Sequence, residues 1–477
     1  MNVSDLSALL PLIIIATTVI VVMFVIAFFR NHKLTAVLTL AGLALAGASL
    51  MIVSPMVRRS ITPLLILDSY GLFYTGLIFI ASFAVASLSY SYLEIQEGHR
   101  EEFYLLLLLA TLGCAVLAES THFASLFLGV EILSVSLYAL AAYLRHSDRS
   151  IEAGVKYLIL AAVSSAFILF GMALVYAETG SMDFTHIAAR SASPGVHGLP
   201  FTAGIAMIII GLGFKLAVVP FHLWTPDVYE GAPAPVTAFV STASKGAVFA
   251  VVLRYFSMVG ITISGPIFMI FTIIAIASMF TGNLLALFQS NIKRILAYSS
   301  ISHLGYILVT LLASGTMAAT AAAFYLSAYF ITTLGAFGVV TVLSEKDRDA
   351  DSMDDYRGLA WRRPWLAGVF TAMLLSLAGI PLTAGFVGKF YIAAAGIGSG
   401  LWLLVIILTV NSVLGLYYYL RIIVVLYMRG EEEVLATPRL SLSGSAVLAG
   451  LTVLLVWLGV YPVPVIQMIQ KMVQGLT

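Results

Sequence analysis

Cysteine and charge are what this sequence has least of. Its 477 residues include one cysteine, Cys114, and a single thiol can neither close an internal disulfide nor hold an iron–sulfur cluster. Charged residues are 10% of the chain and hydrophobic residues 61%, which excludes a soluble globular protein. The CxxC, HExxH, P-loop and GxGxxG motifs are also missing, so we expect no redox cofactor, nucleotide or metal in this chain.

Long apolar runs fill the chain instead, each about 20 residues in length, which is enough to cross a bilayer core. They predict an all-α integral membrane protein, one polytopic domain over residues 1–477, with about fourteen transmembrane helices. The predicted helices are 9–29, 34–53, 70–93, 103–118, 121–143, 153–177, 201–223, 235–254, 264–288, 295–313, 318–343, 365–395, 401–428 and 441–468. Basic residues follow the first run, Leu9–Phe29, rather than precede it, so we expect a retained span and not a cleaved signal peptide.

Lysine and arginine are unevenly divided between the predicted loops. Fourteen, Lys293 among them, follow odd-numbered helices, and five follow even-numbered ones: Arg58, Arg59, Arg190, Arg254 and Lys471. Because cytoplasmic loops carry the excess of basic residues, this predicts both termini on the outer side of the membrane. The charged segment Glu345–Arg363 suits a solvated surface or a neighbouring subunit, and the run Glu431–Glu433 suits a solvated loop.

Two predicted helices are interrupted. The stretch Gly211–Pro235 carries Lys215 and then four prolines, and Trp365–Ala395 is broken by GIPLTAG shortly before Lys389. A break frees backbone groups that lipid cannot satisfy, so it must face protein or a water-filled cavity. Interrupted helices in corresponding places of two halves indicate inverted repeats, which we place at about 103–254 and 264–428.

A buried amine and a buried carboxylate form the first candidate site. Charged groups are costly in hydrocarbon and mark ion or proton pathways more often than not. Lys215 lies well inside its span, and Glu131 lies at the middle of another with no charge within ten residues. If the two side chains pair, each holds the charge of the other. The alternatives are a structural Lys215 capped by carbonyls at the break, and a protonated Glu131 bonded to a neighbouring helix.

Three further lysines lie within predicted helices. Lys245 is at the middle of its helix among small residues that leave room for water, and Lys389 follows the second break. Lys156 is only one turn inside its helix. Long side chains near a helix end can snorkel to the surface, so this alternative is weak for Lys245 and stronger for Lys389 and Lys156. The deep lysines outnumber the one deep carboxylate, so either some lysines are neutral or water reaches them, and both conditions suit a proton relay.

Histidines are weaker candidates. His222 follows Lys215 by seven residues and would share its face if the helix continued through Pro220. His303 lies among hydroxyl groups in YSSISHLGY. Each is either a relay group or a hydrogen-bonding core residue. Asp227 and Glu230, in the polar connection, either admit protons or cap the next helix.

Five stretches carry a resemblance to a known family. They are FYLLLLLATLG, FASLFLGVEILS, GLGFKLAVVPFHLWTPDVYEGAPAPV, NIKRILAYSSISHLGY and LSLAGIPLTAGFVGKFY. Together they resemble the antiporter-like membrane subunits of complex I, the proton-translocating NADH:quinone oxidoreductase, across essentially the whole chain. Within that family the length and Lys389 in GFVGKFY are most similar to the bacterial N-type branch, relatives of mitochondrial subunit 2.

The resemblance implies two inverted five-helix repeats, each with a discontinuous helix. It also implies site residues: Glu131 and Lys215 look like the glutamate–lysine pair of the family and Lys156 like its modulating lysine. Lys245 looks like the central relay lysine and Lys389 the lysine of the outward half-channel. Flavin, iron–sulfur clusters and the quinone site would belong to other subunits.

The sequence therefore predicts a proton-translocating subunit of an NADH:quinone oxidoreductase in a bacterial inner membrane. The implied partners are the antiporter-like M-type subunit, the small subunits that lead to the quinone site, and the lipid bilayer, with no nucleic acid. The alternatives are a subunit of a cation/proton antiporter or membrane-bound hydrogenase, and a structural spacer whose lysines are inert.

Overall fold

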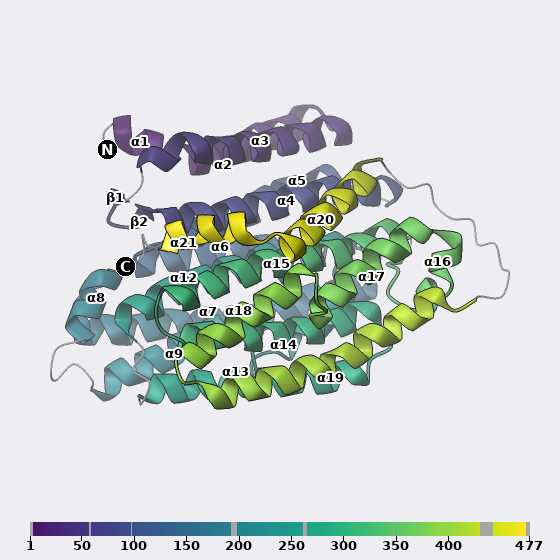
Figure 1. Cartoon of the computed structure of the whole chain (residues 1–477). Coiled ribbons are helices and arrows are strands. Elements are labelled where there is room, and N and C mark those ends of the chain that lie inside the picture. Colours follow the sequence, from purple (N-terminus) through teal and green to yellow (C-terminus); the bar gives the residue numbers. More distant parts are fainter. Residues whose placement is uncertain are drawn as a thin grey trace.

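The chain folds into helices whose axes lie side by side, as Figure 1 shows. This computed structural model describes residues 3–56, 59–96, 98–191, 198–260, 265–346, 348–429 and 442–473. Within those residues, 13 helices are long and apolar enough to cross a membrane, and the strands form one two-stranded sheet. The predicted all-α membrane fold is confirmed.

The helices are numbered in chain order. The first half contains α1 (Val3–Ala8), α2 (Leu10–Phe28), α3 (His32–Val53), α4 (Ser69–Ile95), α5 (Glu101–Glu119), α6 (Phe123–Ala141), α7 (Asp148–Thr179), α8 (Phe184–Ser191), α9 (Leu199–Leu216), α10 (Trp224–Gly231), α11 (Ala234–Phe239) and α12 (Lys245–Val259). The second half contains α13 (Pro266–Leu287), α14 (Ile292–Leu312), α15 (Thr316–Leu343), α16 (Leu359–Arg362), α17 (Pro364–Ala378), α18 (Ala384–Gly398), α19 (Trp402–Tyr427), α20 (Leu442–Val460) and α21 (Val463–Val473).

Shorter elements connect some of these helices. A 3-10 turn, η1 (Ser54–Met56), and the antiparallel strands β1 (Arg59–Thr62) and β2 (Leu65–Leu67) lie between α3 and α4. A π-helical turn, η2 (Val240–Ser244), joins α11 to α12, and a 3-10 turn, η3 (Met353–Tyr356), precedes α16.

Thirteen of the fourteen predicted segments correspond to the spans, and the fourteenth, 365–395, is the pair α17 and α18. Two boundaries were wrong. The helix predicted over 201–223 ends at Leu216, and the one predicted over 441–468 ends at Val460, where Pro462 removes a backbone donor before α21 begins. Residues 430–441, with the run Glu431–Glu433 and Arg439, lie outside the described residues, as does Arg58.

Both ends of the described chain lie at one end of the bundle (Figure 1), next to β1 and β2. We call this the hairpin end, and the opposite end, which carries α16, the loop end. The middle of the bundle is formed by α11 with α12, α14 and α15, whose residues are mostly buried. Most residues of α2 and α20 are not buried within the chain. The buried middle is where a polar side chain needs a partner.

The first break separates α9 from α10. Ala217, with φ 61°, ends α9 in the left-handed region, and the Val218 amide donates back to the Gly213 carbonyl at 3.0 Å. Pro220 then prevents the helix from resuming, because it has no backbone N–H. The freed amide of Val219 donates to Ser278 Oγ at 3.0 Å, so a neighbouring helix satisfies the break, as membrane backbone requires.

The second break separates α17 from α18. Gly379, with φ 85°, ends α17, and the Thr383 hydroxyl caps α18 by accepting from the Phe386 amide at 3.4 Å. Gly385 then passes so close to Ser376 that an added Cβ would lie 1.9 Å from the Ser376 carbonyl oxygen. The predicted interruption at GIPLTAG is therefore confirmed, and glycine is what lets the two half-helices meet.

Replacing Gly385 by alanine is expected to destabilise the protein by about 1–3 kcal/mol, because overpacking at a backbone contact forces the half-helices apart. The matched control is Gly368→Ala in α17, where an added Cβ meets nothing within 4 Å and helix propensity improves. Thermal denaturation of the purified protein compares the two. Equal stability of both variants would contradict the close contact at the break.

Candidate functional site

Lys215 lies in the last turn of α9, directly before the break. Its Nζ donates to Ser134 Oγ of α6 at 2.5 Å and lies 5.8 Å from the ring centroid of Tyr157. The side chain is buried, with 4% of its surface exposed. A helix C-terminus favours a cation, because its last carbonyls lack intrahelical donors. The break and the amine therefore belong to one local structure.

Glu131 lies on α6 one turn before Ser134, so it occupies the same side of the helix as the hydroxyl bound by Lys215. Its Oε1 accepts from Ser165 Oγ of α7 at 2.5 Å. Within the described residues, no ion pair of 4.0 Å or less joins Glu131 to Lys215. The two predicted partners thus form no direct ion pair: Lys215 binds Ser134, one turn of α6 from Glu131, and Glu131 binds Ser165.

Lys245 begins α12, immediately after the π-helical turn η2. Its Nζ donates to Ser300 Oγ of α14 at 2.7 Å and lies 5.3 Å from the ring centroid of Tyr229. Ser300 Oγ also shares a hydrogen bond of 2.6 Å with the hydroxyl of Tyr329 on α15. π-Turns are frequent at functional sites, and this one places the amine among three hydroxyl-bearing side chains.

His303 follows Ser300 by one turn of α14 and is buried. Its Nδ1 is 2.6 Å from the Tyr325 hydroxyl, and its Nε2 is 3.1 Å from the Tyr419 hydroxyl. The imidazole ring also lies 5.5 Å from the Tyr329 ring, measured between centroids. Both ring nitrogens therefore have hydroxyl partners that can either donate or accept, which lets the proton sit on either nitrogen.

Lys389 lies in the second turn of α18 and reaches back across the break. Its Nζ donates to the carbonyl oxygens of Leu377 and Ala378, the last residues of α17, and to Ser412 Oγ, each at 2.9 Å. It also lies 5.2 Å from the ring centroid of Tyr306, one turn beyond His303 on α14. The amine caps the end of α17, an arrangement that had been considered for Lys215 and not for Lys389, and it lies beside the aromatic cluster around His303.

One face of α14 therefore connects two of the lysines. Ser300 binds Lys245, His303 is at the centre, and Tyr306 lies under Lys389, at a spacing of three residues. Side chains three and four residues apart in a helix share a face. The structure thus brings together Lys245, His303 and Lys389, and groups Lys215 with Glu131 through α6.

Replacing His303 by alanine is expected to slow proton transfer along this face by roughly 10²-fold, the range lost when a positioned proton-transfer group is removed. Acidification of vesicles that contain the assembled complex measures it. His186→Ala, whose side chain is 76% exposed, is the matched control and should behave as wild type. Unchanged acidification in the His303 variant would leave this residue a core hydrogen-bonding group.

Two of the predicted site residues lie elsewhere. Lys156 is at the loop end, 41% exposed, and forms ion pairs of 2.7 Å with Glu152 and with Asp227. His222 lies in the connection after α9, and because α9 ends at Leu216 the condition for sharing a face with Lys215 is not met. Its Nδ1 is buried and has no hydrogen-bond partner among the described residues.

A polar cavity of about 260 Å³ opens at the loop end, lined by Arg149, Glu152, Ala153, Lys156, Asp227, Glu230, Gly231 and Arg294. Asp227 is central to it, because its two oxygens bind Lys156 and Arg294 at 2.7 and 2.9 Å. Partial burial by itself raises the pKa of Asp227, but the hydrogen bonds from Lys156 and Arg294 outweigh it and lower the pKa below its usual value. The cavity is therefore a charged, water-accessible vestibule next to α10.

Two buried basic residues had been assigned to loops and were missed as candidates. Arg254 lies inside α12, where it pairs with Asp68 at 2.5 Å, and its side chain is 0% exposed. Lys293 lies in the first turn of α14 and pairs with Asp349 at 2.6 Å. Both sit near predicted helix ends, where sequence patterns cannot separate a solvated residue from a buried one. An acidic partner far away in the chain gives no local signal.

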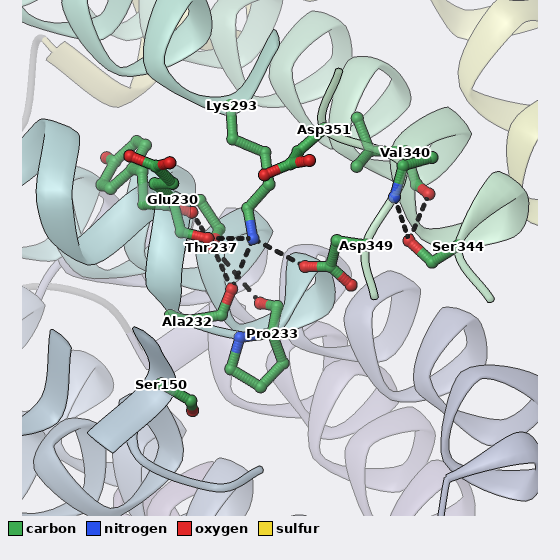
Figure 2. A network of polar contacts seen from close by, with 12 residues as sticks. Ser150, Glu230, Ala232, Pro233, Thr237, Lys293, Val340, Ser344, Asp349 and Asp351 are labelled. Carbon is green, nitrogen blue, oxygen red and sulfur yellow. Dashed lines mark hydrogen bonds and ion pairs between the residues drawn. The ribbon is translucent and has the colours of Figure 1, made fainter. Parts of the chain in front are cut away.

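Figure 2 shows the Lys293 network. The amine points at the carbonyl oxygens of Glu230 and Ala232, which it binds at 2.9 and 2.6 Å, and at Asp349. Asp349 also accepts from the Tyr92 hydroxyl of α4 at 2.8 Å. Lys293 thus fastens the end of α10 to the segment after α15, which is part of the charged stretch that the sequence placed at a solvated surface.

No group of three or more metal-ligating side chains occurs among the described residues. The site is instead a set of amines, hydroxyls and one imidazole within helices, which can hold and exchange protons but offers no converging ligand set.

Comparisons with known proteins place this fold in context. Residues 120–415 match the family described as NADH:quinone oxidoreductase/Mrp antiporter, TM. A chain of respiratory complex I from Thermus thermophilus with bound aureothin is 33% identical, covers 96% of this chain and 98% of its own, and superposes with a TM-score of 0.82.

Two more distant chains share the fold. One is from the membrane-bound sulfane sulfur reductase, an archaeal respiratory membrane complex, at 24% identity, 99% and 98% coverage, and a TM-score of 0.86. The other is from the Mrp complex of Dietzia sp. DQ12-45-1b, at 21% identity, 99% and 97% coverage, and a TM-score of 0.86. The matched family model spans the broken helices and all the buried lysines. This chain belongs to the NADH:quinone oxidoreductase/Mrp antiporter family of membrane subunits.

Proposed function

We propose that this chain is a proton-translocating membrane subunit of an NADH:quinone oxidoreductase, without redox centres of its own. The observation that carries the proposal is the bonding of Lys215, Lys245 and Lys389. Each donates to uncharged oxygen atoms, and within the described residues none lies within 4.0 Å of a carboxylate. A lysine paired with a carboxylate would leave a buried anion when it lost its proton, whereas these three would not.

The route we propose begins at the Glu131–Lys215 group. Quinone chemistry in other subunits changes the charge near Glu131. This change alters the proton affinity of Lys215, because the two titratable groups are coupled. The proton or its charge then passes to Lys245, and through Ser300, Tyr329 and His303 to Lys389. Between Lys215 and Lys245 the described residues offer Tyr157, Trp224 and Tyr229 in successive ring contacts of 4.8 and 6.4 Å. Water must therefore complete this step.

Proton uptake is proposed at the loop-end cavity. Lys156 there lies between the solvated carboxylates Glu152 and Asp227, whose hydrogen bonds stabilise its charge. In this proposal the loop end faces the cytoplasm and the hairpin end faces the periplasm, as the excess of basic residues in the odd-numbered loops favours. That excess remains after the corrections for Lys293 and Arg254, which remove one residue from the larger set and one from the smaller set.

The proposed assembly is a bacterial complex I, with the chain in the N-type position. The 33% identity to a complex I chain over nearly the full length of both supports complex I over the more distant complexes. Flavin, iron–sulfur clusters and the quinone site are proposed for partner subunits, and the M-type subunit and the small subunits toward the quinone site as membrane neighbours. The two repeats, 103–254 and 264–428, are part of the same proposal.

A second candidate is a subunit of a cation/proton antiporter, which the family description itself includes and the shared fold with an Mrp chain favours. The two functions differ in their partners. An oxidoreductase subunit would co-purify with flavin and iron–sulfur proteins, and an antiporter subunit with membrane subunits alone.

The experiment is purification of the tagged full chain from its native membranes, followed by identification of its partners by mass spectrometry and an NADH:quinone activity assay. We expect flavin- and iron–sulfur-containing subunits and quinone-dependent NADH oxidation that acidifies reconstituted vesicles. Sodium-dependent proton exchange by a complex without redox subunits would replace this proposal with the antiporter function.

A further inference from the structure

A second buried carboxylate lies far from the relay, at the hairpin end. Glu119 is the last residue of α5 and is 2% exposed. Its Oε1 accepts from Thr75 Oγ1 of α4 at 3.4 Å, a long and weak bond. The C-terminus of a helix disfavours an anion, because its free carbonyls carry partial negative charge. The position is therefore a poor one for an ionised glutamate.

Among the described side chains, Arg254 is the one cation that acts on Glu119, and it is already neutralised. Arg254 of α12 binds both oxygens of Asp68, through Nη1 to Oδ2 at 2.5 Å and Nη2 to Oδ1 at 2.9 Å, in the paired geometry typical of strong arginine–carboxylate contacts. Its Nη2 also donates to the Ala118 carbonyl at 3.1 Å, next to Glu119 in the chain. Within the described residues, no ion pair of 4.0 Å or less joins Glu119 to Arg254.

Charge counting then decides the state of Glu119. Within the described residues, one guanidinium lies beside two carboxyl groups, and the other titratable groups of the cluster are the phenols of Tyr70 and Tyr74 on α4, which are neutral near pH 7. With both carboxyls ionised, the buried cluster would carry one unbalanced negative charge, which burial strongly disfavours. With a proton on Glu119 the cluster is neutral.

The cluster also contains two hydrogen-bond donors that have no acceptor among the described residues. Arg254 Nε and the Tyr74 hydroxyl are buried and make no hydrogen bond within the described part of the chain. Gly71 permits the close packing, since a Cβ there would lie 3.1 Å from Asp68 Oδ1 and 3.1 Å from Glu119 Cγ. Asp68 and Glu119 thus pack against the same glycine, and Arg254 is close enough to both carboxyl groups for its charge to act on each.

We propose that Glu119 is a proton-binding site, and that its protonation state depends on whether Arg254 pairs with Asp68 or with Glu119. While Arg254 pairs with Asp68, Glu119 holds its proton. When Arg254 turns to Glu119, the carboxyl loses the proton and becomes the partner of the guanidinium. Asp68 then takes up a proton, so the cluster stays neutral. This site is nine residues from Lys245 along α12, about 14 Å at 1.5 Å per residue, and does not depend on the relay proposed above.

Infrared spectroscopy of the purified complex tests this directly, because a protonated carboxyl has a C=O band that shifts in D₂O and that carboxylates lack. Glu119→Gln, the neutral isostere, is expected to lose one such band and to keep the thermal stability of the wild type. The matched control is Glu102→Gln on the same helix, whose carboxylate pairs with Arg30 at 2.9 Å and should contribute no such band.

Asp68→Asn tests the control by Arg254. The amide keeps the cap on α4, where Asp68 Oδ1 now accepts from the Gly71 amide at 2.6 Å, but it removes the charge that holds Arg254. Arg254 should then draw Glu119 into an ion pair, and the Glu119 band should disappear. An unchanged band after Glu119→Gln, or failure of that isosteric variant to assemble, would overturn the proton site. A Glu119 band that persists in Asp68→Asn would overturn the role of Arg254.

Discussion

Replacing Lys215 by alanine is expected to lower coupled proton translocation by on the order of 10²-fold while the complex still assembles. The amine is the only charged group at the end of α9 and donates to Ser134 at 2.5 Å. Its removal leaves no buried group without a partner, because the Ser134 hydroxyl also donates to the Val130 carbonyl at 2.5 Å. Vesicle acidification driven by NADH measures the effect, alongside quinone reductase activity.

The same assay on Glu131→Ala should show a comparable loss, because Glu131 lies one turn of α6 away from Ser134, the residue that Lys215 binds. Lys471→Ala is the matched control, since this lysine is exposed on α21. Ser134→Ala tests whether the hydrogen bond that positions the Lys215 amine matters as much as the amine itself. It keeps the amine and removes only its acceptor, so a smaller loss is expected. Wild-type acidification in both Lys215→Ala and Glu131→Ala would leave these residues as structural groups and favour an inert spacer.

Replacing Asp349 by alanine is expected to destabilise the protein by about 3–5 kcal/mol, the cost of removing one partner from a buried ion pair. Lys293 would keep a charge that is 1% exposed, and the Tyr92 hydroxyl would lose its acceptor. Because Lys293 also binds the carbonyls at the end of α10, the loss should spread to the loop-end cavity (Figure 2). Thermal denaturation in detergent measures the change.

The surface pair Arg348–Asp355, only a few residues away in the same segment, is the matched control. Arg348 is 56% exposed, and exposed pairs contribute about 0–1 kcal/mol, so Arg348→Ala should leave stability nearly unchanged. Asp349→Asn provides the intermediate case, because the amide still accepts from Tyr92. Similar stability losses for Asp349→Ala and Arg348→Ala would show that the Lys293 ion pair contributes no more than a solvated one.

Sequence patterns located the spans well because a bilayer imposes a length and a composition on every crossing. The interruption before Lys389 could also be predicted from the sequence. GIPLTAG contains glycine and a proline, and proline breaks or kinks a helix because it has no backbone N–H. The end of the helix that carries Lys215 was predicted seven residues too late, because α9 ends at Leu216 and the left-handed conformation of its cap, Ala217, has no signal in the sequence. That difference separated His222 from Lys215.

The chain by itself therefore determined the membrane fold, the two broken helices and three of the buried lysines, Lys215, Lys245 and Lys389, because each follows from hydrophobic length, proline and the cost of charge in lipid. Only the tertiary structure decided what each charge contacts. It showed Lys215 on Ser134 beside Glu131, His303 between Lys245 and Lys389, and Lys156 among solvated carboxylates. It also showed that Arg254 is buried with Asp68, since partners that meet across helices can be 186 residues apart.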